Sequence, residues 1–180
     1  MEHFRINDKL RMELVKAEMA PVVFQAIDRD REYLKQWLPF VNYTSEVADT
    51  EKFLQAVSDE NNQRDTVYSI WYKEEFAGLI GFKDTDWENR KTEIGYWLSE
   101  KMQGKGIVTA CVKQLIEYAF ARLKMFRIQI KVAEGNHKSE AIPKKLNFTF
   151  EGIERGGERD GTQMRNLRVY SLIATDRFNL

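Results

Sequence analysis

The sequence is poor in the residues that build disulfides and metal sites. Among its 180 residues Cys111 is the only cysteine, so no internal disulfide can form. The two histidines, His3 and His137, lie far apart in the sequence, and this predicts that the protein holds no metal. Cys111 falls on the apolar side of a helical pattern, which indicates a buried structural thiol and not a nucleophile.

Long apolar runs and an excess of one charge are missing as well. No apolar run reaches the roughly 18 residues of a membrane-spanning helix, and the N-terminus lacks a signal-peptide core. Lys and Arg number 28 and Asp and Glu also number 28, whereas nucleic-acid-binding proteins usually carry a basic surplus. These features predict a cytoplasmic protein that binds neither membranes nor nucleic acids directly.

The composition is that of a folded protein. Hydrophobic residues make up 43% of the chain and charged residues 31%, which is typical of globular proteins and not of disordered ones. No repeat, low-complexity tract or linker divides the sequence. We therefore expect residues 1–180 to form a single domain, and this length is sufficient for a hydrophobic core.

Residues 93–123 form the most informative segment. Ile94, Tyr96 and Leu98 alternate with other residues, as in a strand. Apolar residues then recur at steps of three and four, as in a helix. Those positions are Val108, Cys111, Val112, Leu115, Ala119 and Leu123.

Between the expected strand and helix lies the sequence Gln103-Gly104-Lys105-Gly106. Two glycines at the start of a helix allow backbone N–H groups to converge where the helix dipole is positive, and this favours an anion such as a pyrophosphate. A tight turn without a ligand is the alternative. The segment is not a P-loop, because Gly106 follows Lys105 and no glycine stands at Glu100. A dinucleotide fingerprint would require a third glycine at Thr109.

Periodicity along the rest of the chain predicts an α+β (mixed α/β) fold, with a mixed sheet covered by helices on both faces. Strands are expected at residues 10–15, 66–72, 76–82, 93–98, 127–132, 148–155 and 168–173, and helices within 18–38 and at 46–61, 107–123 and 139–146. The charged run 28–32 breaks the first helical region into two. In the helix at 46–61, Thr44 or Ser45 is the expected cap and Phe53 is expected to face inward with Leu54 and Val57. The glycine-rich residues 156–161 are expected to join the last two strands as a loop.

The pattern Gln103-x-x-Gly106-x-Val108 resembles the Gln/Arg-x-x-Gly-x-Gly/Ala signature of the GNAT acetyltransferases, whose acyl donor is acetyl-coenzyme A (acetyl-CoA). Val108 departs from the small residue usual at its position, which puts the close approach of the donor's phosphates in question. The resemblance implies the GNAT-type acyl-CoA N-acyltransferase fold, with a largely antiparallel, twisted sheet and a core at roughly residues 10–173.

A second segment, residues 127–152, is similar to the Asn-x-x-Ser…Lys-x-Gly-Phe…Glu-Gly region of the RimJ/RimL-type branch of that family. Residues 33–39 and 94–98 also resemble this branch, which acetylates N-terminal amines of proteins, notably ribosomal proteins. Asn147 replaces the usual glycine before Phe148, but asparagine tolerates the left-handed backbone that a turn there requires. Members of the branch often form dimers, so a homodimer is possible.

The resemblance also implies which residues contact the acetyl-CoA donor. Asn136 would bind the pantetheine arm, with a turn or a helix cap as its alternative role. The strand at 93–98 would pair with the same arm through its free backbone groups. The complete implied set of donor-binding residues is Tyr96, Trp97, Leu98, Gln103, Gly104, Lys105, Gly106, Ile107, Val108, Thr109, Asn136 and Ser139.

Acetyl transfer to an amine requires a base, because a protonated amine has no free electron pair. The resemblance assigns this role to Glu158. It assigns hydrogen bonding to the departing thiolate to Ser139, whose alternative role is a helix cap. Many GNAT enzymes use a tyrosine for that step, but Pro143 stands at its position here. Neighbouring carboxylates that compete with the proposed base are Glu151, Glu154 and Asp160.

The sequence thus predicts an acetyl-CoA-dependent N-acetyltransferase that uses direct transfer in a ternary complex. The preferred acceptor is a protein N-terminal α-amine. A small amine (a polyamine, an amino acid or an antibiotic) is the alternative acceptor, and a non-catalytic CoA-binding module is the alternative from another functional class. Trp37, Trp87 and Tyr96 are aromatic candidates for the acceptor side, and a role in the core is the alternative for Trp37 and Trp87.

Overall fold

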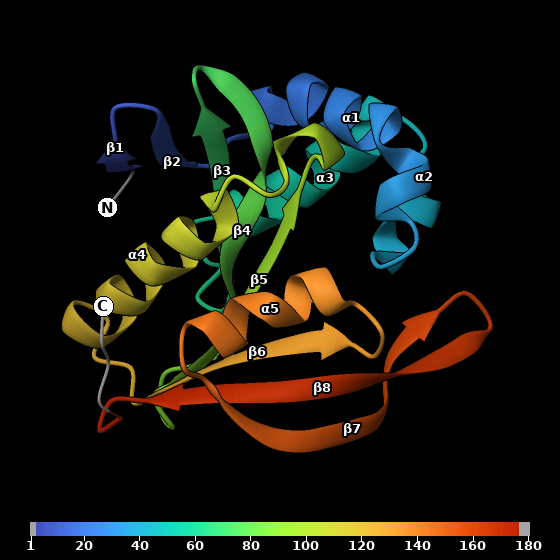
Figure 1. Cartoon of the computed structure of the whole chain (residues 1–180). Coiled ribbons are helices and arrows are strands. Elements are labelled where there is room, and N and C mark those ends of the chain that lie inside the picture. The colour runs from blue at the N-terminus through green and yellow to red at the C-terminus, as the bar shows by residue number, and fades with distance from the viewer. Residues whose placement is uncertain (1–2, 177–180) are drawn as a thin grey trace.

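In the computed structural model, which describes residues 3–176, eight strands form one sheet in the order β1-β2-β3-β4-β5-β6-β8-β7 (Figure 1). Neighbouring strands are antiparallel except β5 and β6, which are parallel. The strands are β1 His3–Asn7, β2 Leu10–Leu14, β3 Thr66–Tyr72, β4 Glu75–Asp86, β5 Lys91–Leu98, β6 Arg127–Ala133, β7 Thr149–Asp160 and β8 Gln163–Ile173. The helices are α1 Ala20–Arg29, α2 Arg31–Leu34, α3 Val47–Ser58, α4 Ile107–Ala121 and α5 His137–Lys145, with 3-10 turns η1 Ala17–Met19, η2 Pro39–Tyr43 and η3 Glu100–Met102. The predicted mixed, largely antiparallel α+β fold is confirmed.

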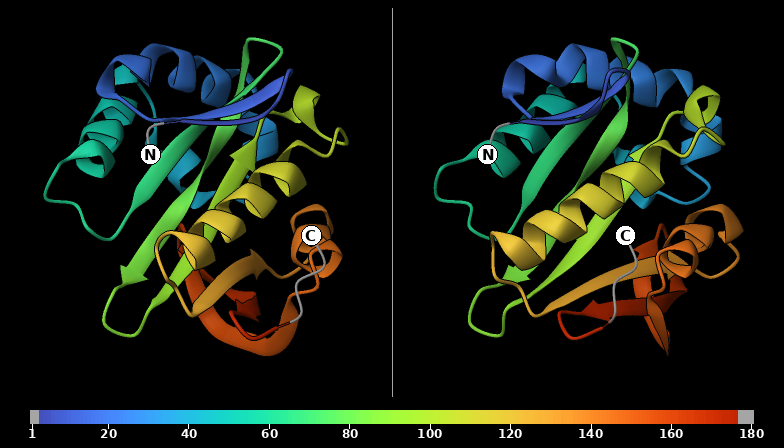
Figure 2. Two further views of the ribbon diagram at one scale, coloured as in Figure 1. Left: turned by 90° about the vertical axis from the view of Figure 1, so that its left-hand side faces the viewer. Right: turned by 60° about the vertical axis from the view of Figure 1, so that its left-hand side comes forward.

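Helices cover both faces of the sheet, as Figure 2 shows. On one face, apolar residues of α1 and α3, such as Val23 and Leu54, form a core with Leu79 of β4. On the other face, Leu115 of α4 packs with Ile80 of β4. Leu79 and Ile80 are adjacent and point to opposite faces, as the pleat of a strand requires. The central strands are therefore buried on both sides.

The sheet opens between β5 and β6. Their parallel pairing covers only Lys91↔Arg127, Thr92↔Ile128 and Glu93↔Gln129. β5 then continues to Leu98, still paired with β4 as far as Gly78↔Leu98. On the side that faces β6, residues 94–98 have no strand partner within residues 3–176, so their backbone N–H and C=O groups remain available to a ligand. We call this stretch the free edge of β5.

The hairpin formed by β7 and β8 differs from the sequence prediction. The expected glycine-rich loop at 156–161 is wrong, because β7 continues to Asp160 and pairs again with β8 at Glu158↔Arg165. The register shifts between Glu154 and Glu158, where Gly156 has a φ of +61°, so the extra residues are absorbed as an irregularity within the strand. The hairpin extends to the end of α2, where Arg165 Nη1 donates to the carbonyl oxygen of Gln36 at 2.8 Å.

Two further corrections concern the N-terminal half. Residues 3–7 form the edge strand β1, which was not predicted. The helix α3 is capped by Glu46, which exchanges side chain–backbone hydrogen bonds with Asp49, and not by Thr44 or Ser45. Phe53 is 46% exposed and not inward-facing, whereas Leu54 is fully buried. Adjacent helical residues are separated by about 100° around the axis, so the face that buries Leu54 turns Phe53 toward solvent.

The helix α5 and its C-terminal turn agree with the sequence expectations. Asn147 has a φ of +59°, the left-handed conformation predicted there. Pro143 lies inside α5, and a proline has no N–H to donate to the carbonyl four residues earlier. The carbonyl that loses its helical partner is that of Ser139. It accepts a hydrogen bond from the Tyr96 hydroxyl at 3.1 Å instead.

Candidate active site

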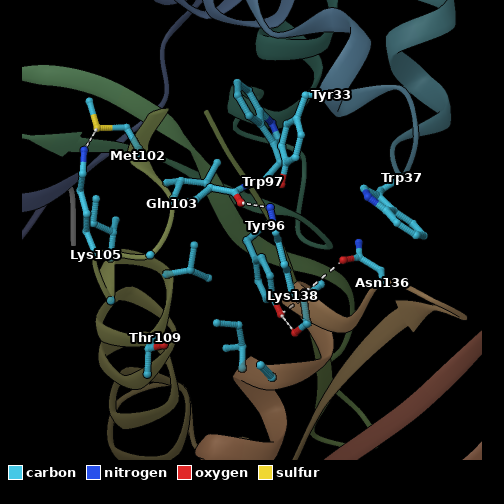
Figure 3. Close-up of a pocket in the computed structure, with 18 of the residues that line it drawn as sticks. Tyr33, Trp37, Tyr96, Trp97, Met102, Gln103, Lys105, Thr109, Asn136 and Lys138 are labelled. Atoms are coloured by element: carbon cyan, nitrogen blue, oxygen red, sulfur yellow. Dashed lines mark hydrogen bonds between the residues drawn. The ribbon is translucent and has the colours of Figure 1, made fainter. Parts of the chain in front are cut away.

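A pocket of about 680 Å³ lies where the free edge of β5, the start of α4 and the start of α5 meet (Figure 3). This volume falls in the range of small-molecule sites. All twelve residues predicted to bind the donor line this pocket. The lining consists of Tyr33, Leu34, Trp37, Leu38, Tyr96, Trp97, Leu98, Met102, Gln103, Gly104, Lys105, Gly106, Ile107, Val108, Thr109, Asn136, Lys138, Ser139, Ala141, Ile142 and Lys145.

One wall of the pocket is the N-terminus of α4. Gly104 and Gly106 have φ angles of +72° and +73°, a left-handed backbone that favours glycine. The first backbone bond of the helix runs from the Ala110 N–H to the Gly106 carbonyl, so the preceding amides are not used within the helix. Successive amides in such a turn, together with the helix dipole, form a site for an anion.

The charges around the pocket also favour an anion. Three lysines line it, Lys105, Lys138 and Lys145, and none of its lining residues is an aspartate or glutamate. The chain as a whole has equal numbers of acidic and basic residues. The positive potential is therefore local to this pocket, where it attracts an anionic ligand.

Two of these lysines are oriented differently. Lys105 is turned toward Met102, and its Nζ donates to the carbonyl oxygen of Lys101 at 2.8 Å (Figure 3). Lys138 extends from α5 across the pocket, where its Nζ donates to Gln103 Oε1 at 3.1 Å. Gln103 in turn donates to the Tyr33 hydroxyl. Lys138, Gln103 and Tyr33 thus connect α5, the loop before α4 and α2, and Lys138 forms no ion pair within residues 3–176.

Asn136 and Ser139 come together at the start of α5. Asn136 caps the helix by accepting the Ser139 N–H on Oδ1 at 3.1 Å, which is the alternative role considered for it. The cap is therefore Asn136 and not the Ser139 hydroxyl. Ser139 Oγ donates instead to the Tyr96 hydroxyl at 3.2 Å. Burial raises the pKa of Tyr96, so this phenol stays protonated at neutral pH.

Glu158, the predicted base, does not line the pocket, but it differs from its neighbours in being unpaired. Its carboxylate forms no ion pair or hydrogen bond within the described part of the chain. Burial raises the pKa of its carboxyl group, and the charges of Lys83 and Arg165 partly oppose that effect. A half-buried carboxylate with a raised pKa and no partner has the properties of a general base.

The three competing carboxylates are all engaged in ion pairs. Glu151 accepts two hydrogen bonds of 2.6 Å from Arg127, and these bonds lower the pKa of Glu151 to about 2. Glu154 lies 2.7 Å from the Lys131 ammonium. Asp160 is paired with an arginine of β8. A carboxylate held by a cation is a weaker base than a free one.

The charges that act on Glu158 indicate where it lies relative to the pocket. They include Lys83 and Glu93, which belong to the strands beside the opening of the sheet. Glu93 is only 3% exposed, and its Oε1 lies 2.7 Å from Lys83 Nζ. Because side chains alternate along a strand, Glu93 and Tyr96 point to opposite faces of β5. Trp97 shares the face of Glu93, and both Trp97 and Tyr96 line the pocket, so the pocket is lined from both faces of the sheet. Glu158 therefore lies on the Trp97 side, near the place where β5 and β6 separate.

Of the two tryptophans considered for acceptor contact, one lines the pocket and the other does not. Trp37 lines the pocket, and its ring lies beside Gly135, where an added Cβ would meet it at 3.8 Å. Trp87 lies in the turn between β4 and β5, at the other end of β5, and its indole N–H donates to the Gln63 carbonyl at 2.6 Å. Trp87 is therefore excluded from the pocket. Tyr33 and Lys138 line the pocket but were not predicted, although Lys138 lies inside the Asn136-x-x-Ser139 motif.

The other sequence predictions concern metal, membrane and thiol chemistry. No group of three or more His, Cys, Asp and Glu residues suited to a metal occurs within residues 3–176. Over the same residues, no helix is long and apolar enough to cross a membrane. Cys111 is fully buried, and burial raises its pKa to about 12, so this thiol is structural, as predicted.

Comparison with known proteins supports one family. A family model described as an acetyltransferase (GNAT) domain matches residues 9–149. A Bacillus subtilis (strain 168) protein named "Putative ribosomal N-acetyltransferase YdaF" is 33% identical over 173 residues, which cover 94% of this chain and 93% of YdaF. Both results agree with the resemblance found in the two sequence motifs.

Two solved structures are similar over nearly the whole chain. RimL, a ribosomal L7/L12 alpha-N-protein acetyltransferase in complex with coenzyme A, has a TM-score of 0.90 and 25% identity, and covers 96% of this chain and 98% of its own. The microcin C7 self-immunity acetyltransferase MccE, in complex with acetyl-CoA and AMP, has a TM-score of 0.88 and 27% identity, with 93% and 94% covered. From its sequence, fold and pocket, the chain belongs to the GNAT family of acetyltransferases.

Proposed function

We propose that the protein transfers the acetyl group of acetyl-CoA to the N-terminal α-amine of a protein, by direct transfer in a ternary complex. The observation that carries the proposal is the pocket at the start of α4, which has three lysines and no acidic residue and adjoins the free edge of β5. In this proposal residues 1–180 act as one domain, with the core at roughly residues 10–173. The relatives named for ribosomal-protein acetylation support the choice of acceptor.

The residues of the pocket are suited to coenzyme A. The unused amides at the start of α4 provide donors for its pyrophosphate. The free edge of β5 offers N–H and C=O groups to the amides of the pantetheine arm. Val108 is larger than the usual residue; it packs partly against the core formed with α4 and also lines the pocket, and in this proposal the backbone amides beside it still bind the phosphates.

Lys138 is expected to bind a phosphate of the donor. Replacing Lys138 by methionine should weaken coenzyme A binding about 10-fold, since a charge-assisted hydrogen bond contributes about 1.5–3 kcal/mol. Isothermal titration calorimetry measures this loss directly. Lys113→Met, on α4 outside the pocket, is the matched control and should bind coenzyme A normally. The KM for acetyl-pantetheine, which carries no phosphate, should be equal in the Lys138 variant and the parent; an equal loss for both donors would contradict phosphate contact.

The proposed chemistry uses groups on both faces of the sheet. Glu158 accepts a proton from the ammonium form of the acceptor, whose pKa is about 7.7–8.0, so that the amine can attack. A C–N bond forms and the C–S bond breaks. Backbone N–H groups of the free edge of β5 stabilise the negative charge that develops on the carbonyl oxygen. Ser139 donates a hydrogen bond to the sulfur as it leaves as a thiolate.

The burial of Cys111, the one cysteine of the chain, favours direct transfer. An acyl-enzyme route through a thiol requires an accessible thiolate. Cys111 is fully buried and its pKa is raised to about 12. A thiol acyl-enzyme is therefore excluded, which favours reaction of the amine with the thioester itself while both substrates are bound.

A matched pair of peptides tests the acceptor. We expect thiol release from acetyl-CoA with a lysine-containing decapeptide that has a free N-terminus, and none with the same peptide whose N-terminus is acetylated beforehand. Mass spectrometry should place the new acetyl group on the α-amine. Turnover with a polyamine, an amino acid or an aminoglycoside antibiotic, but with neither peptide, would identify a small amine as the acceptor instead. Binding of coenzyme A without turnover on any amine would indicate a non-catalytic module.

A further inference from the structure

The hydroxyl groups of Tyr96 and Ser139 form a pair that neither the sequence motifs nor the family match assigns. Ser139 Oγ donates to Tyr96 Oη at 3.2 Å. Tyr96 Oη donates its own hydrogen to the backbone carbonyl of Ser139 at 3.1 Å. The phenol therefore makes two contacts with one residue on another element, and both residues line the donor pocket.

The reason that Tyr96 can make the second contact lies in Pro143. In a regular helix the carbonyl of residue 139 would accept the N–H of residue 143. Proline has no N–H, and its ring pushes the carbonyl of the residue four positions earlier away from the helix axis. The Ser139 carbonyl is thus left as an acceptor without a helical partner, and a buried carbonyl in that state is costly unless another donor reaches it. The Tyr96 hydroxyl is that donor.

We propose that Tyr96 is a positioning residue for Ser139, held in place by the backbone carbonyl that Pro143 leaves without a helical partner. The inference depends on the proposed role of Ser139 in thiolate departure. With Tyr96 Oη fixed by the carbonyl, Ser139 Oγ is held at one place in the pocket. Only the hydroxyl hydrogen of Ser139 then has to rotate, from Tyr96 toward the departing sulfur.

This arrangement places the oxygen of the donor before the negative charge appears, so that only its hydrogen has to turn, and a low cost of reorganisation favours electrostatic stabilisation. Neither oxygen has to move, so little reorganisation accompanies the reaction. Burial raises the pKa of Tyr96, and the phenol therefore keeps its hydrogen for the Ser139 carbonyl throughout. No proton is lost by either hydroxyl, since the proton of the acceptor amine goes to Glu158.

A double-mutant cycle between Tyr96 and Pro143 tests the inference. Tyr96→Phe removes the donor and leaves the Ser139 carbonyl unpaired, so the urea midpoint should fall. Adding Pro143→Ala restores an N–H at residue 143, which can pair with that carbonyl. The double variant should therefore recover the midpoint lost by Tyr96→Phe, and the two substitutions should be strongly non-additive.

Turnover should behave differently from stability in the same variants. Tyr96→Phe and Ser139→Ala should each lower kcat about 10-fold, with coenzyme A affinity within about twofold of the parent. The double variant Tyr96→Phe/Pro143→Ala should remain as slow as Tyr96→Phe, because the Ser139 hydroxyl still lacks its partner. If Tyr96→Phe alone fails to fold, the double variant supplies the kinetic measurement. Tyr118→Phe, which removes a hydroxyl that forms no hydrogen bond within residues 3–176, is the matched control.

Two results would overturn the inference. Recovery of kcat together with stability in the double variant would mean that Tyr96 acts only through the fold. A parental kcat in a folded Tyr96→Phe variant would mean that it has no role in the reaction. Failure of the proposed function itself is distinguishable, because the parent protein would then transfer no acetyl group while the stability cycle would still show the Tyr96–Pro143 coupling.

Discussion

Replacing Glu158 by glutamine is expected to lower kcat about 100-fold, since general base catalysis typically contributes 100- to 10,000-fold. The affinity for coenzyme A should stay within about twofold, because Glu158 lies outside the donor pocket. Glutamine keeps the size and shape of the side chain but cannot accept the proton of the acceptor amine. Steady-state kinetics with a peptide acceptor and calorimetry with coenzyme A measure the two quantities.

The pH dependence gives a second test of Glu158. Burial raises the pKa of this carboxyl group, and only its ionised form can act as a base. The kcat of the parent should therefore fall as the pH is lowered through a value above the usual pKa of glutamate, about 4.3. In Glu158→Gln this acidic limb should disappear.

The neighbouring Glu154 provides the control for both measurements. It lies on the same strand and is paired with Lys131 at 2.7 Å. Glu154→Gln should retain kcat within about threefold and should keep the acidic limb. Parental turnover in Glu158→Gln, combined with a large loss in Glu154→Gln, would move the base to Glu154.

Glu140→Ala is expected to lower the free energy of unfolding by about 3 kcal/mol, the lower end of the cost of removing one partner from a buried ion pair. Glu140 is a buried residue of α5. Its carboxylate accepts from the Tyr170 hydroxyl and lies 2.7 Å from Arg168 Nε and 3.0 Å from Lys144 Nζ. The substitution leaves the Tyr170 hydroxyl and the Arg168 guanidinium, both on β8, without this acceptor. Urea denaturation measures the loss.

This loss should depend on pH in a defined direction. Hydrogen bonds from Tyr170 and Lys144 lower the pKa of Glu140 to about 2, against about 4.3 in an unfolded chain. A lowered pKa in the folded state means that the stabilisation is complete above about pH 4.3 and is lost as the pH falls toward 2. The difference between the parent and Glu140→Ala should therefore shrink across that interval.

An exposed glutamate on a helix is the control for Glu140. Glu117 lies on α4 and is exposed, and Glu117→Ala should change the unfolding free energy by no more than about 0.5 kcal/mol. Equal losses for Glu140→Ala and Glu117→Ala would show that the ion pairs of Glu140 contribute nothing beyond the helix itself. A constant difference from pH 7 to pH 2 would contradict the lowered pKa.

Periodicity was sufficient to predict most of the strands and helices, whereas the residues expected at the pocket were implied by the resemblance of two motifs to the GNAT family. Strands such as β6 show a clear alternation of apolar and polar residues, because every second side chain, such as Ile128 and Ile130, points into the core. The glycines before α4 form one short motif and Asn136-x-x-Ser139 forms another, and each can be recognised from a few consecutive residues. The cytoplasmic location and the homodimer stay predictions.

The features that were missed depend on contacts between distant residues. The glycines at 156–157 indicate a loop when read alone, but pairing of Glu158 with Arg165 keeps them in a strand. Trp37 follows α2 and Trp87 follows β4, and only the folded chain shows that the first lines the pocket while the second lies at the other end of β5. The contact between Tyr96 and Ser139 joins residues 43 positions apart, and no periodic pattern encodes it.

The opening between β5 and β6 has a consequence for how the molecule responds to its donor. Three residue pairs connect the two parts of the sheet, and the amides of residues 94–98 that face the opening exchange with solvent unless something binds there. A bound pantetheine arm would form hydrogen bonds at the opening and would slow the exchange of these amide hydrogens. The melting temperature would then rise with the concentration of acetyl-CoA. The protein would therefore be most stable when acetyl-CoA is abundant.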